Sequence, residues 1–146
     1  PALLSARVVS LYNLITTLEP LGRREGLLAK AEELSRIARR SRTFEPNDRL
    51  IAWRARNADA LLAQLLGLAG RHDEALAVQR GIVALDRERL GRAPADVRIA
   101  RDLGFSTQLL GTLIWEAGDR PGACRRWEEA DRLFVALERR GALNQW

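Results

Sequence analysis

The chain has 146 residues, of which 47% are hydrophobic and 29% charged, so it is long enough for one folded domain with a hydrophobic core. Its net charge is +5, but acidic residues are interleaved with the basic ones, which favours a solvated surface over a nucleic-acid interface. The single cysteine excludes an intramolecular disulfide, and no run of 18 apolar residues marks a membrane segment. Residue types that favour helices dominate, and β-branched residues are sparse. The composition therefore predicts an all-α protein.

Apolar residues recur at helical spacing in successive stretches of the chain. The helices are predicted near residues 2–19, 23–41, 47–69, 72–90, 96–117 and 120–140. Pro20 and Gly22 separate the first two helices, and Pro46 is expected to begin the third.

The last two helices form the clearest hairpin. Gly118 is expected to stop the first of them in a left-handed conformation. Asp119 can then cap the second helix, with Pro121 in its first turn. Small residues at Gly111 and Ala123 are placed where the two helices approach each other closely.

An internal repeat relates the hairpins. Gly22, Gly70 and Gly118 lie 48 residues apart, and no insertion is needed to keep this interval. The same interval joins residues of the connectors, namely Pro46 with Pro94, Asp48 with Asp96, and Ile51-Ala52 with Ile99-Ala100. Similarity at a fixed period of this size is typical of a solenoid.

The stretch 110–130 resembles a tetratricopeptide repeat. The signature positions of that family are occupied by Leu110, Gly111, Gly118, Ala123, Trp127 and Ala130. Residues 101–106 also resemble a long variant of the repeat found in large bacterial multidomain proteins. The resemblance implies a right-handed α-solenoid of three helical hairpins, with repeats at about 1–45, 46–93 and 94–141 and a tail at 142–146. We expect residues 1–146 to be a single repeat domain cut from a longer bacterial protein.

The resemblance also implies a site. In tetratricopeptide repeats the first helix of each pair lines a concave groove that binds partners. Carried onto this sequence, the groove residues are Tyr12, Thr16, Asn57, Ala60, Gln64, Phe105, Gln108, Thr112 and Trp115. Amides can pair with a peptide backbone, and aromatic rings offer a large contact area.

No catalytic or metal-binding set is apparent. His72 and Cys124 fall in different repeats, and a zinc site needs several such ligands. The carboxylates share their faces with arginines, which gives an acid/base pair no support. We therefore expect neither an enzyme nor a bound cofactor or metal.

Arginines gather near the ends of the second helix of each pair. These clusters are Arg36, Arg39, Arg40 and Arg42, then Arg87, Arg89 and Arg92, then Arg139 and Arg140. They could meet an acidic surface or a phosphate backbone, but acidic neighbours dilute them. Ion pairs at i,i+4 spacing are expected for Glu32 with Arg36, Glu88 with Arg92 and Glu128 with Arg132.

The leading prediction is a cytoplasmic protein–protein interaction module that holds a peptide or helix in its concave groove and acts in regulation or scaffolding. A first alternative is a small-ligand sensor that gates an attached effector domain. A second alternative is self-association, as a homodimer, through repeat ends that lack a polar cap. The last helix would then expose apolar residues such as Leu133 or Leu137.

Overall fold

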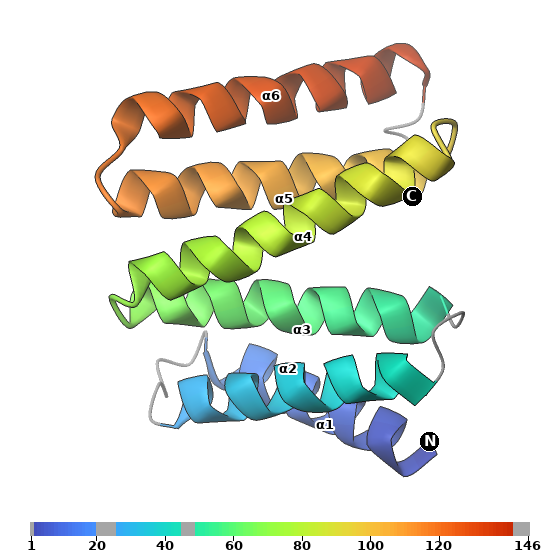
Figure 1. The fold of residues 1–146 in the computed structure, drawn as a ribbon, viewed down its shortest axis with the longest axis vertical. Coiled ribbons are helices and arrows are strands. Elements are labelled where there is room, and N and C mark those ends of the chain that lie inside the picture. Colours follow the sequence, from blue (N-terminus) through green and yellow to red (C-terminus); the bar gives the residue numbers. More distant parts are fainter. Residues whose placement is uncertain (1, 20–25, 45–48, 142–146) are drawn as a thin grey trace. The chain divides into compact units, whose positions relative to one another are not determined.

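The computed structural model describes residues 2–19, 26–44 and 49–141 of the chain. Within these ranges the protein is all-helical and has no strand (Figure 1). The six helices are α1 (Ala2–Leu18), α2 (Leu27–Phe44), α3 (Arg49–Leu68), α4 (His72–Arg92), α5 (Val97–Glu116) and α6 (Arg120–Arg139). The predicted helical class and the number of helices are confirmed.

The helix bounds differ most from the sequence expectation at α2. Helix α2 begins at Leu27 rather than at residue 23, since Gly26 before it has a φ of 68°, outside the helical region. It also continues to Phe44 instead of ending at residue 41. Helix α4 extends to Arg92, where an ion pair from Glu88 spans its last turn. The breaks expected at Pro20, Gly22 and Pro46 lie outside the described residues.

The chain folds as two compact units. Unit 1 contains residues 1–71 and unit 2 contains residues 72–146. The boundary follows Gly70, whose φ of 76° ends α3, and it falls within the second predicted hairpin. The single-domain organisation and the three-hairpin solenoid stay predictions.

In unit 1, helix α2 packs against both α1 and α3. Each helix buries an apolar stripe, and the innermost residues are Val8, Ile15, Leu27, Ala31, Leu34, Ala38, Ala55 and Ala58. Polar contacts add to this seam. The Ser35 hydroxyl donates to Asp59 Oδ1 at 2.5 Å, and Arg39 Nε donates to the same carboxylate at 3.0 Å.

In unit 2, helix α5 packs against both α4 and α6. It carries the largest share of the buried residues in this unit, including Ile99, Leu103, Leu110, Leu113 and Ile114. A buried amide crosses to the neighbouring helix, because Gln79 Nε2 donates to the backbone oxygen of Ser106 at 2.7 Å. This bond compensates for burying the Nε2 end of the side chain, while Gln79 Oε1 is buried without a hydrogen-bond partner among the described residues.

The α5–α6 hairpin forms as the sequence predicts. Gly118 has a φ of 93°, and Asp119 Oδ1 accepts from the backbone N–H of Gly122 at 2.9 Å. Pro121 lies in the first turn of α6, where no donor is lost. Two glycines of α5 meet aromatic rings of α6. A Cβ on Gly104 would lie 2.7 Å from Phe134, and one on Gly111 would lie 2.6 Å from Trp127.

Two groups of expectations need correction. Of the three predicted i,i+4 ion pairs only Glu88–Arg92 forms. Glu32 instead pairs at 2.8 Å with Arg71, which is not a neighbour on the same helix. Glu128 and Arg132 do not pair. Leu137, expected to be exposed at an uncapped end, is only 2% exposed because it packs on Ala100 of α5.

Candidate partner-binding surfaces

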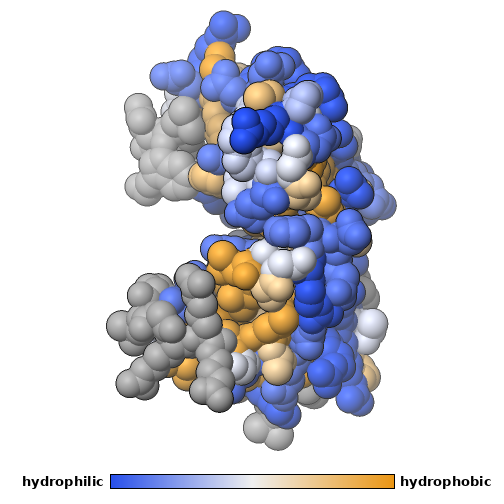
Figure 2. Space-filling view, turned by 90° about the vertical axis from the view of Figure 1, so that its left-hand side faces the viewer, coloured by the Kyte–Doolittle hydropathy of each residue, from blue (hydrophilic) through white to orange (hydrophobic). Residues whose placement is uncertain are grey.

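An apolar groove lies between α1 and α3 of unit 1. It has a volume of about 250 Å³ and is lined by Val8, Val9, Tyr12, Asn13, Leu50, Trp53, Arg54 and Asn57. Figure 2 shows a face of the molecule on which apolar side chains are open to the surface. All the residues that line the groove belong to unit 1. The groove is therefore a feature of unit 1 alone.

The position of the groove follows from how the helices pack on α2. Helices α1 and α3 turn their most buried residues, such as Ile15 and Ala58, into the core. The groove is lined by the neighbouring face of each helix. Its apolar side chains stay accessible, with Val9 38% exposed, Leu50 52% and Trp53 46%. Large apolar groups gathered at one accessible place are typical of an interaction surface.

Polar groups at this groove are partly engaged already. Arg56 Nη1 donates to Asn57 Oδ1 at 3.3 Å, which leaves the donor side of the Asn57 amide for other partners. Thr16, one turn beyond Tyr12, uses its hydroxyl within its own helix and donates to the Tyr12 carbonyl oxygen at 2.9 Å. The Thr16 hydroxyl already donates its proton within α1, so it does not offer a donor to a ligand.

A second accessible surface lies on α5 of unit 2. Phe105 and Trp115 are 51% and 42% exposed, although both stand among the rings of α6. Phe105 meets Phe134 edge to face with ring centroids 5.2 Å apart, and Trp115 lies 5.6 Å from Trp127. A depression of about 370 Å³ opens beside them and is lined by Gln108, Trp127, Ala130, Asp131 and Phe134.

The nine predicted groove residues are thus divided between the units. Tyr12 and Asn57 both line the apolar groove, while Thr16 and Gln64 are exposed outside it and Ala60 is half-buried. On unit 2, Phe105, Gln108, Thr112 and Trp115 lie along a single helix at spacings of three and four residues. Thr112, like Thr16, turns its hydroxyl to a carbonyl of its own helix, that of Gln108 at 3.4 Å.

The sequence reasoning missed several residues that build the groove. They are Val8, Val9, Asn13, Leu50, Trp53 and Arg54. Trp53 precedes the predicted Asn57 by one helical turn, so extending the same helix face toward the N-terminus would have found it. The sequence does not identify Val8 and Val9 as groove residues, because the apolar residues of α1 that line the groove cannot be distinguished by type from those that face the core.

Metal ligands are not gathered in the part of the chain that the structure describes, where no three His, Cys, Asp or Glu side chains form a group able to hold an ion. His72 is half-buried at the start of α4, and Cys124 is exposed on α6. None of the helices in the described ranges combines the length and apolar character that crossing a bilayer requires.

Comparison with known proteins adds no family to this description. No family model matches the chain, and no curated protein matches it. The likeness to tetratricopeptide repeats therefore rests on the residues quoted above, and the function has to be argued from the surfaces themselves.

Proposed function

We propose that the chain is a helical-repeat protein of the tetratricopeptide type, a solenoid of three hairpins, and that it binds a peptide segment of a protein partner. The observation that carries the proposal is the apolar groove between α1 and α3. Its exposed Leu50 and Trp53 lie beside the polar Tyr12 and Asn57, which the resemblance had placed on the partner-binding face.

The size of the groove favours the side chains of a peptide over a drug-sized ligand or a cofactor. Its volume of about 250 Å³ falls below the range of roughly 300–1,000 Å³ in which drug-sized ligands and cofactors are usually held. It suits one or two apolar side chains that project from a larger partner. Aromatic anchors such as Trp53, set in a polar surround, are typical of the residues that dominate binding energy in protein interfaces.

The polar residues suit a peptide main chain. The amides of Asn13 and Asn57 and the phenol of Tyr12 offer neutral donors and acceptors beside the apolar floor. A helical partner would insert side chains at i and i+3 or i+4, and an extended one would insert alternate side chains. Neither arrangement requires a covalent or catalytic step.

The test is a selection of peptides from a random library on the immobilised protein, followed by affinity measurements with variants. Leu50→Ser and Trp53→Ala should each weaken the selected peptides about tenfold or more, as expected for a central apolar anchor. Leu68→Ser is the matched control, because Leu68 lies on the same helix, is 48% exposed and does not line the groove. It should bind normally.

Equal binding by Leu50→Ser, Trp53→Ala and Leu68→Ser would show that the groove is not the site. The spacing of apolar residues in the selected peptides then separates a helical from an extended partner. A variant of Arg39 is not a clean control for surface charge, since that guanidinium pairs with Asp59, whose side chain is only 18% exposed.

A further inference from the structure

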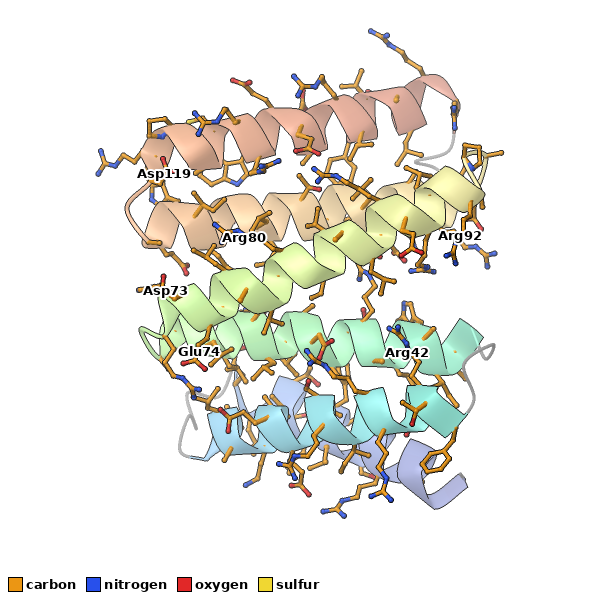
Figure 3. All side chains as sticks on the ribbon, viewed as in Figure 1. Arg42, Asp73, Glu74, Arg80, Arg92 and Asp119 are labelled. Atoms are coloured by element: carbon orange, nitrogen blue, oxygen red, sulfur yellow. The ribbon has the colours of Figure 1, made fainter. Side chains whose placement is uncertain are left out.

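Four arginines line a pocket of unit 2, and this pocket shares no residue with the apolar groove of unit 1. The pocket has a volume of about 260 Å³, and α4, α5 and α6 all contribute to it. Arg80 and Arg87 come from α4, where they are two turns apart on one face, and Arg125 and Arg126 come from α6. Figure 3 marks Arg80 on α4 and Asp119 at the start of α6.

Two of these arginines are held by a shared carboxylate. Arg126 Nη1 donates to Glu129 Oε2 at 2.7 Å, and Arg87 donates to Glu129 Oε1. Burial raises the pKa of Glu129, but the hydrogen bonds and charges of Arg87 and Arg126 outweigh burial, so its pKa lies below the ordinary value. Glu129 is therefore a carboxylate at neutral pH that orients both guanidiniums, each of which keeps further N–H donors.

The other two arginines have no such partner. Arg80 and Arg125 make no hydrogen bond or ion pair with any residue in the described part of the chain. Asp119, the only acidic residue among the described residues that line the pocket, already accepts from the Gly122 backbone N–H as the cap of α6. Even if Asp119 and Glu129 are both counted against the four guanidiniums, an excess of two positive charges remains.

We propose that this pocket binds a phosphate dianion, free or as the terminal group of a phosphate ester. Two negative charges match the excess of two, and a tetrahedral oxyanion can accept from guanidiniums on both α4 and α6 at once. The volume of about 260 Å³ suits a phosphate with a small attached group and is too small for a whole nucleotide with its base. The site rests on the guanidiniums, because the helix N-terminus beside it is already capped by Asp119.

The experiment measures binding to the whole chain at low ionic strength by titration calorimetry. The probes are inorganic phosphate, glucose 6-phosphate and a short phosphoserine peptide, with acetate as a singly charged control. We expect at least one phosphate probe to bind with one-to-one stoichiometry and acetate to bind much more weakly. The probe that binds most tightly identifies the source of the phosphate. If no phosphate probe binds, or if acetate binds as well as they do, the proposal is overturned.

Variants locate the site. Arg80→Gln and Arg125→Gln should each lower the affinity about tenfold or more, as expected for the loss of a charge-assisted contact, with unchanged helicity and melting. Arg132→Gln is the matched control, since it removes the same charge from an exposed position of α6 that does not line the pocket. A loss of affinity in Arg132→Gln equal to that in Arg80→Gln would mean that only the overall charge attracts the anion, and would overturn the proposal. Failure here leaves the peptide-binding proposal untouched, because Leu50 and Trp53 are not part of this pocket.

Discussion

At the scale of single residues, the closest helix approaches in unit 2 depend on the absence of a side chain. Gly104 and Gly111 are buried on the face of α5 that meets α6, and an aromatic ring occupies the space beside each of them. A Cβ added at Gly111 would meet the indole of Trp127 first and would lie 3.3 Å from the backbone oxygen of Ala123. The ring and the facing backbone together leave no room for a methyl group.

Gly111→Ala should therefore destabilise the protein. Its Cβ would lie 2.6 Å from Trp127, so the indole has to move away from its partner Trp115. We expect a loss of about 1–3 kcal/mol in the free energy of unfolding, the usual cost of overpacking. A chemical melt followed by circular dichroism measures it.

Gly81→Ala is the control for this change. Gly81 lies within α4, and a Cβ there would meet nothing within 4 Å. The same substitution should then stabilise the protein by about 0.5–1 kcal/mol, since alanine loses less backbone freedom in a helix. Equal effects at the two glycines would contradict a tight contact at Gly111.

The cap of α6 is a second prediction at this scale. Asp119→Ala removes the acceptor of the Gly122 N–H and should lower the stability by about 1 kcal/mol. Asp131→Ala, an exposed position in the middle of the same helix, should change the stability much less. Thermal melts of the two variants compare them. If both changes cost the same, the loss comes from charge rather than from the cap.

At the scale of helices, ion pairs in unit 2 join elements that are not consecutive in sequence. Arg87 of α4 and Arg126 of α6 share Glu129, and this links two helices that both pack on α5. In unit 1, Arg7 of α1 pairs with Glu33 of α2. The Asp59 carboxylate of α3 accepts hydrogen bonds from Ser35 and Arg39 of α2.

The Glu129 link predicts a pH dependence. The pKa of Glu129 is lower in the folded chain than in the unfolded one, so its stabilising contribution is present at neutral pH and is lost as the pH falls through the folded pKa. Glu129→Gln should cost at most about 1 kcal/mol near pH 7, because its arginine partners are largely exposed. The difference from the parent should shrink toward zero as the pH falls through the lowered pKa of Glu129. Glu128 is an exposed neighbour that pairs with no residue in the described ranges, so Glu128→Gln should show little effect at either pH in the same denaturant melts. A cost for Glu129→Gln that does not change with pH would contradict the link.

Local signals explain which helices could be predicted. Period, caps and turn glycines depend on neighbouring residues, so the α5–α6 hairpin with Gly118 and Asp119 was predicted closely. The predicted start of α2 at residue 23 is wrong, because Gly26 has a positive φ and the helix begins only after it. The pairing of Glu32 with Arg71 could not be predicted, since these residues are brought together only by tertiary packing.

The candidate site could be predicted only in part for the same reason. The repeat resemblance selected one face of each first helix, which was enough to find Tyr12 and Asn57. A groove needs two helices at a particular separation, and that separation depends on how both pack on α2. The arginine pocket was missed altogether, because residues 80, 87, 125 and 126 come together only through the packing of α4, α5 and α6.

At the scale of the whole molecule, the chain has two compact units, and each of them contains buried apolar residues. Leu34 is fully buried in unit 1, and Leu110 is 4% exposed in unit 2. Because each unit is compact by itself, the loss of a buried side chain in one unit should destabilise mainly the helices of that unit.

Leu34→Ala should therefore lower the protection of α2 amides from hydrogen exchange while those of α5 and α6 keep most of theirs. A buried Leu→Ala change costs about 2–5 kcal/mol, enough to make local opening measurable. Leu110→Ala should give the opposite pattern. A uniform loss of protection in both variants would mean that the chain unfolds as one cooperative unit.

The placement of the tryptophans has an optical consequence. Trp53 stands half in solvent at the groove of unit 1, so the wavelength of its emission should respond to anything that excludes water there. Trp115 and Trp127 lie 5.6 Å apart with their rings inclined at 34°, close enough for their excited states to couple. Loss of that coupling in the ultraviolet dichroism would report separation of α5 from α6. The protein thus carries one built-in fluorophore for its groove and a separate chromophore pair for its last hairpin, and neither signal requires an added label.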